Sequence, residues 1–172
     1  DLLNEYDKEK AERVMEIENT IDHYEDKLGS YMVKLSSKTL SEHDSQTVSI
    51  LLHSISDFER ISDHAVNIVK TAKELHDKKE TFSEKAQEEL KVATDALREI
   101  IKLTLKVFEN EDVTLAAKVE PLEEVIDSIQ AELKKRHVKR LRNGKCTIEL
   151  GFAFSDVMAN YERVADHCSN IA

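Results

Sequence analysis

The sequence predicts an all-α protein built from five long antiparallel helices. Its 172 residues include only three glycines and one proline, the residues that most often interrupt regular structure. Charged residues make up 35% of the chain and aromatic residues 5%, and the composition is rich in helix-forming side chains. Apolar residues recur at spacings of three, four or seven, which is typical of one face of a helix.

The first two helices are expected at residues 2–35 and 42–76. In the first, Val14, Ile21 and Leu28 mark a one-sided apolar stripe. The second follows Ser41, a residue type that caps helix N-termini by accepting a hydrogen bond from the backbone. It carries apolar residues on more than one side, so we expect it to lie centrally in the bundle.

Three further helices are expected at residues 83–109, 113–141 and from 147 to the end. Ser83 is a good helix-initiating residue for the third. Pro121 lies inside the fourth range, and proline either kinks a helix or occupies its first turn, which moves the expected start toward residue 121. Gly144 follows the fourth helix and favours its termination.

An internal repeat relates the two halves of the chain. Residues 57–68 and 160–171 share Glu, Arg, an aliphatic residue, Asp, His, Asn and Ile in the same order. The preceding helices match as well, whereas the helix at 83–109 has no counterpart upstream. We therefore predict two pseudo-repeated three-helix units: residues 1–79, which lack the leading helix, and residues 80–172. The chain is expected to be part of a longer protein.

The repeat carries four Glu-x-x-x-Asp pairs, and this spacing places both carboxylates on one helix face. Acids near a packed apolar stripe are unfavourable unless something compensates their charge. One interpretation is metal binding, in which oxygen ligands suit hard cations such as Fe(III), Mn(II), Mg(II) or Ca(II). The other is neutralisation by Arg60 and Arg163. The pairs are Glu18 and Asp22, Glu59 and Asp63, Glu123 and Asp127, and Glu162 and Asp166.

Other features argue against an enzyme and against nucleic-acid binding. His64 and His167 turn about 100° away from the preceding aspartates and are expected either to lie on the surface or to form hydrogen bonds between helices. The sequence has no phosphate-binding glycine loop and no nucleophile elbow. A net charge of −10 disfavours contact with nucleic-acid phosphates. The basic residues 134–142 either complement a helix C-terminus or bind an anionic partner such as a lipid surface.

The segments Glu-Arg-Ile-Ser-Asp-His at 59–64 and Glu-Arg-Val-Ala-Asp-His at 162–167 resemble the PhoU family. Together with residues 40–46 and 142–146, they make the chain similar to the C-terminal PhoU-like domain of bacterial sodium/phosphate cotransporters. This resemblance implies a fold of two three-helix bundles. It also implies that the eight paired acids bind metal ions, iron or zinc first, with manganese or magnesium as further candidates.

The resemblance further implies a role in modulating phosphate transport. The partner would be a membrane-embedded transporter domain of the same chain, which would hold this domain at the cytoplasmic face of the membrane. The absence of the leading helix would leave an apolar face that a homodimer would cover. The alternative is a purely structural helical bundle that binds a protein partner without metal.

Overall fold

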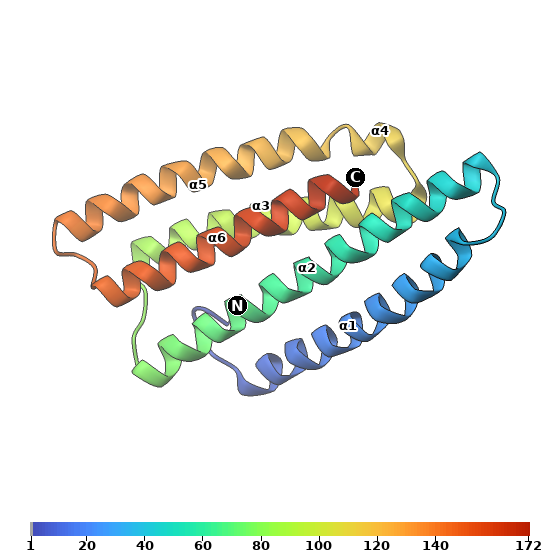
Figure 1. Cartoon of the computed structure of the whole chain (residues 1–172). Coiled ribbons are helices and arrows are strands. Elements are labelled where there is room, and N and C mark those ends of the chain that lie inside the picture. The colour runs from blue at the N-terminus through green and yellow to red at the C-terminus, as the bar shows by residue number, and fades with distance from the viewer. Residues whose placement is uncertain (1) are drawn as a thin grey trace.

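A computed structural model describes residues 2–172, which form an all-helical bundle (Figure 1). The prediction of an all-α fold with five long helices is confirmed. A further helix, α4, is a single turn between α3 and α5. The elements are α1 (Lys8–Ser36), α2 (Glu42–Lys78), α3 (Glu84–Asn110), α4 (Val113–Ala116), α5 (Val119–Arg142) and α6 (Ile148–Ile171).

The long helices run alternately up and down the bundle (Figure 1). Helices α3, α5 and α6 pack against one another, while α1 and α2 form a hairpin. The hairpin joins the three-helix part through α2, which lies beside α6. Within residues 2–172, α1 contacts no helix other than α2, so one side of the hairpin has no helical neighbour. Helix α2 is therefore central, as its two apolar sides predict.

Side-chain caps determine where four of the long helices begin. An unpaired backbone N–H in the first turn needs an acceptor, and a short polar side chain immediately before the helix supplies one. In each case the capping oxygen accepts from the amide three residues later. The caps are Asp7 for α1, Ser41 for α2, Ser83 for α3 and Thr147 for α6.

The first helix was predicted to begin at residue 2, and this start is wrong. Asp7 accepts a hydrogen bond from the backbone N–H of Lys10 at 3.2 Å and begins α1 at Lys8. The preceding residues pack against the bundle instead. Leu3 lies against the hydrophobic core, and the ring of Tyr6 stacks on that of His76 with centroids 4.8 Å apart. Burial of these side chains replaces the extra helical turns.

The predicted helix at 113–141 is also corrected, because it is divided into α4 and α5. Asp112 caps α4 by accepting from the N–H of Leu115 at 2.9 Å, and the helix ends after one turn. Pro121 lies in the first turn of α5. There it loses nothing by lacking an N–H, since first-turn amides have no acceptor within the helix. The shift of the start toward Pro121 was therefore correct in direction.

The hydrophobic core lies mainly among α3, α5 and α6. Ile100, Phe154 and Met158 are essentially inaccessible to solvent there. Helix α1, by contrast, buries only Ala11, and its Tyr24 and Tyr31 side chains are exposed. The two halves thus share a repeat but differ in packing. None of the helices in residues 2–172 combines the length and apolar character needed to traverse a bilayer.

The end of α2 provides a test of backbone strain. Lys79 has φ of 55°, a left-handed conformation that favours glycine, while the N–H of Glu80 donates to the carbonyl of Leu75 at 2.9 Å. We expect Lys79→Gly to raise the free energy of unfolding by about 0.5–1 kcal/mol, because glycine removes the Cβ clash. Urea denaturation measures this change.

The matched control is Lys78→Gly, one residue earlier and inside the last turn of α2. It should lower the free energy of unfolding by about 0.5–1 kcal/mol, because glycine is unfavourable within a helix. If both substitutions lowered the free energy of unfolding, the left-handed conformation of Lys79 would not be a source of strain.

Candidate functional site

Two histidines occupy the centre of the interface between α2 and α6. The rings of His64 and His167 stack with their centroids 5.6 Å apart. These histidines hold equivalent positions in the two repeated segments, 103 residues apart. The contact therefore joins the same residue of each repeat, as expected at a pseudo-twofold axis.

Each histidine also bonds to the first residue of the opposite repeated segment. Nδ1 of His167 lies 2.8 Å from Oδ1 of Asp57, and Nδ1 of His64 lies 2.9 Å from Oδ1 of Asn160. The amide of Asn160 donates to the carbonyl of Asp156 at 2.8 Å, which leaves its oxygen to accept from His64. Of the two roles expected for the histidines, on the surface or between helices, the interhelical one is observed. Sequence reasoning gave no role to Asp57 and Asn160, whose partners lie on the opposite helix.

In the first unit, carboxylates of α1 and α2 come together. The pKa of Glu59 is raised by burial, by Asp63 on the same helix, and by Glu25 and Asp22 on α1. Glu18 is not among the groups that most strongly affect the pKa of Glu59. Glu25 was not predicted, although it continues the line of acids along α1 one turn beyond Asp22.

In the second unit, carboxylates of α5 and α6 are close enough to act on one another. Burial raises the pKa of Glu123, and Asp127 and Asp166 raise it further. Burial also raises the pKa of Asp166, and Asp127 and Glu162 add to that increase, whereas Arg163 opposes it. All four acids predicted for this unit therefore contribute to one electrostatic group.

The two acidic groups differ in the basic side chains that lie beside them. In the second unit, Nζ of Lys134 lies 2.8 Å from Glu162, and the guanidinium of Arg163 lies 3.7 Å from Asp166. The position equivalent to Lys134 in the first unit is Gly29, which has no side chain to contribute. Arg60, the equivalent of Arg163, forms no ion pair within the described part of the chain. Neutralisation by arginine therefore applies to the second unit and not to the first.

The oxygen atoms of these acids suit a hard cation, but the side chains are not arranged as a complete set of ligands. Both groups offer carboxylate oxygens and mutual repulsion that a cation would relieve. Yet in residues 2–172 no three His, Cys, Asp or Glu side chains are gathered as a ready ligand set for a metal ion. The helices thus bring the acids together without forming a closed cage.

The arrangement is two helical pairs, each bearing the repeated acids, joined across equivalent histidines. The family model described as the PhoU domain matches residues 1–72 and 90–172, which is most of the chain. The chain belongs to the PhoU family. The likeness predicted from the repeated segments is confirmed at this level.

Two PhoU relatives align over nearly the whole chain. PhoU homolog 1 of Thermotoga maritima, a phosphate-specific transport system accessory protein, is 27% identical over 163 residues and 94% of this chain. A PhoU homolog of the same description from Pseudomonas putida is 25% identical over 171 residues and 99% of this chain. The chain spans 69% and 66% of the lengths of these relatives.

A PhoU structure shares the arrangement of helices. The crystal structure of PhoU from Pseudomonas aeruginosa superimposes with a TM-score of 0.91 at 21% sequence identity. The match covers 99% of this chain and 81% of that one. At this level of identity the comparison establishes the fold.

The histidine contacts predict a measurable contribution to stability. Asp57 is 15% exposed at its side chain and keeps only a 3.3 Å hydrogen bond from Asn170 if His167 is removed. We expect His167→Ala to lower the free energy of unfolding by about 1–3 kcal/mol, because a buried acceptor loses its main donor. His53→Ala, at an exposed position of α2, should change it by less than about 0.5 kcal/mol. Equal effects of the two substitutions in urea denaturation would refute this role.

The raised pKa of Glu59 predicts a pH dependence in metal-free protein. A carboxyl whose pKa is higher in the folded state favours folding when protonated, and that contribution is lost as pH rises through the raised value. Glu59→Gln should therefore match the parent protein below the ordinary glutamate pKa, about 4.3, and be more stable than it at neutral pH.

Urea denaturation with a chelator, from acidic to neutral pH, measures the difference. The exposed Glu88→Gln on α3 is the control and should follow the parent protein throughout. A Glu59→Gln protein that is less stable at neutral pH without metal would contradict the proposed repulsion.

Proposed function

We propose that this chain is a regulatory module of phosphate transport whose acidic groups bind metal ions. Membership of the PhoU family supports the regulatory role, and the two aligned relatives are described as accessory proteins of phosphate-specific transport systems. The observation that carries the metal proposal is the convergence of like-charged acids from two helices in each unit. Binding a cation would convert that repulsion into attraction between the helices.

The residues that would hold metal are the repeated pairs. In the first unit these are Asp22, Glu59 and Asp63, joined by Glu25 and with Glu18 one turn away. In the second they are Glu123, Asp127, Glu162 and Asp166. Iron or zinc follows from the family resemblance, whereas the oxygen-only donor set also suits manganese or magnesium. When bound, the ion would supply positive charge that fixes the angle between the two helices of a unit.

We further propose that the partner is a membrane-embedded sodium-dependent phosphate transporter domain of the same chain, at the cytoplasmic face. A domain held next to its transporter needs little affinity of its own, because tethering provides a high effective concentration. A change at the acidic groups would then alter how α1 or α5 is presented to the transporter. This attachment rests on the sequence resemblance.

A second candidate function is a helical bundle that binds a protein partner without metal. Helix α1 favours it, because large apolar side chains are exposed along this helix, and such surfaces mark interaction sites. A second copy of the chain would be one such partner. The exposed large apolar residues of α1 are Met15, Ile17, Tyr24, Leu28, Tyr31 and Val33.

Elemental analysis of the purified chain separates the two functions. After loading with iron, zinc or manganese and removal of free metal, we expect retained metal that a chelator removes. Replacing Glu59 and Asp63 by Gln and Asn should release metal from the first unit while leaving the helical content unchanged. Absence of retained metal from a folded protein would favour the metal-free bundle.

Lys134 offers a sharper test of the second unit. Its ammonium occupies the neighbourhood of Glu162, so removing it should increase cation binding there about tenfold, as loss of a competing charge-assisted hydrogen bond. We expect Lys134→Ala to raise metal affinity in the protein that already lacks the first-unit acids. Lys135→Ala, one residue away and exposed, removes the same charge without that contact and should have a much smaller effect. Equal effects would show that only net charge matters.

A further inference from the structure

A cavity of about 220 Å³ lies at the end of the bundle where α3 and α6 begin and α5 ends. It is far larger than one water molecule, whose share of liquid volume is about 30 Å³. Its lining contains two cationic side chains, several small polar groups and no carboxylate. The lining residues are Thr81, Phe82, Ser83, Ala86, His137, Arg140, Lys145, Cys146, Leu150 and Phe154.

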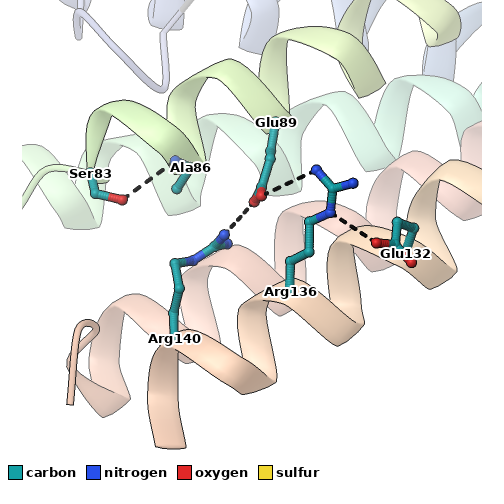
Figure 2. A network of polar contacts seen from close by, with 6 residues as sticks. All are labelled: Ser83, Ala86, Glu89, Glu132, Arg136 and Arg140. Carbon is teal, nitrogen blue, oxygen red and sulfur yellow. Dashed lines mark hydrogen bonds and ion pairs between the residues drawn. The ribbon is translucent and has the colours of Figure 1, made fainter. Parts of the chain in front are cut away.

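Arg140 is held beside this cavity by an acid on its other side. Its Nη1 bonds to Glu89 of α3, and Arg136 approaches the same carboxylate at 3.9 Å while bonding to Glu132 at 2.9 Å (Figure 2). The guanidinium carbon of Arg140 also lies 5.3 Å from the centre of the Phe154 ring. Glu89 is not part of the cavity lining. Arg140 therefore stands between its counter-ion and the cavity.

The guanidinium of Arg140 lies buried beside the cavity. The side chain of Arg140 is 11% exposed, and its Nη2 has no hydrogen-bond partner among residues 2–172. His137, which also lines the cavity, is 4% exposed, and its Nε2 lies against the backbone of Gly151 on α6. Buried groups of this kind normally bond to protein, water or a ligand. A ligand in the cavity that accepts hydrogen bonds would satisfy the guanidinium of Arg140.

At one point of the lining, the Cys146 thiol, a cation acts more strongly than the carboxylate that opposes it. At the Cys146 thiol, Arg140 lowers the pKa by a larger amount than Glu80 raises it, while burial sets the overall increase. Lys145 adds a second cation to the lining. The first turns of α3 and α6 also reach the cavity through Ala86 and Leu150, and helix N-termini favour anions.

We propose that this cavity binds a small tetrahedral oxyanion such as inorganic phosphate. Arg140 would donate through Nη2 and Lys145 would supply a mobile cation at the rim. The hydroxyl of Thr81 would be a further donor to the anion. Phe82 and Phe154 are buried and give the cavity two apolar walls beside these groups. The inference uses residues separate from the acidic groups and does not depend on their binding metal.

Cys146 provides a reporter for this proposal in the intact chain. Its side chain is partly exposed and lines the cavity, whereas Cys168 is buried and its pKa is raised to about 11. Alkylation by iodoacetamide, a neutral reagent, should therefore select Cys146 at mildly alkaline pH, with mass spectrometry identifying the modified residue. We expect inorganic phosphate to slow this reaction in a saturable manner at constant ionic strength. Chloride at the same ionic strength should not slow it.

A matched pair of variants then tests the site. Lys145→Gln should weaken phosphate protection by about tenfold, as loss of one charge-assisted hydrogen bond predicts. Lys139→Gln removes the same charge from an exposed position of α5 outside the lining and should leave protection unchanged. Helical content by circular dichroism checks that both variants fold.

Three outcomes would overturn the proposal. One is the absence of saturable protection by phosphate, and another is an equal loss of protection in the two variants. The third is protection by phosphatidylglycerol vesicles without protection by free phosphate, which would assign the basic residues to a lipid headgroup. Protection by free phosphate that depends on Lys145 supports a site for a free oxyanion.

Discussion

The contact between α2 and α6 through His64 and His167 is the constraint on which the rest of the arrangement depends. The stacked rings and their bonds to Asp57 and Asn160 fix the register of one repeat against the other. Each histidine immediately follows the aspartate of its acidic pair. The interface that fixes the histidines therefore also fixes where Glu59 and Asp63, and their counterparts, lie along the bundle. A shift of α2 would move Glu59 and Asp63, and a shift of α6 would move Glu162 and Asp166.

Around that interface the two units have diverged. The second unit has three helices and a closed core, and its acids are partly neutralised by Lys134 and Arg163. The first unit has a two-helix hairpin, and its acids have only each other as charged neighbours among the groups that shift Glu59. Part of its apolar surface is exposed along α1. The first unit is thus the less tightly packed half, and the negative charge of its acids is less compensated than in the second unit.

Much of this organisation could be predicted from the sequence because it is local or repeated. Helical periodicity and the serine caps at Ser41 and Ser83 located the helices, and the repeated Glu-Arg-x-x-Asp-His segments indicated the family. The two errors in helix boundaries, at the start of α1 and between α4 and α5, arose where a capping residue interrupted an apolar pattern. The first helix was predicted from residue 2, but the Asp7 cap begins α1 at Lys8 and Leu3 packs against the core instead. Asp112 capped a single turn, which separated α4 from the helix that contains Pro121.

The details of the candidate sites depended on contacts between residues distant in the chain. Lys134 approaches Glu162 only because α5 lies beside α6, and a basic run at a helix end gives no indication of which lysine will do so. Arg140 and Glu89 are likewise 51 residues apart. Glu25 was the exception, since it extends a visible line of acids on α1.

The proposed cation would lie beside Glu59 and Asp63, where, among residues 2–172, no lysine forms the ion pair that Lys134 forms with Glu162. Anomalous diffraction from crystals grown with manganese would locate the ion directly. The account predicts a peak between α1 and α2 next to these two acids, with a weaker peak or none beside Glu162, where Lys134 lies. A peak confined to the second unit, or no peak at either acidic group, would contradict it.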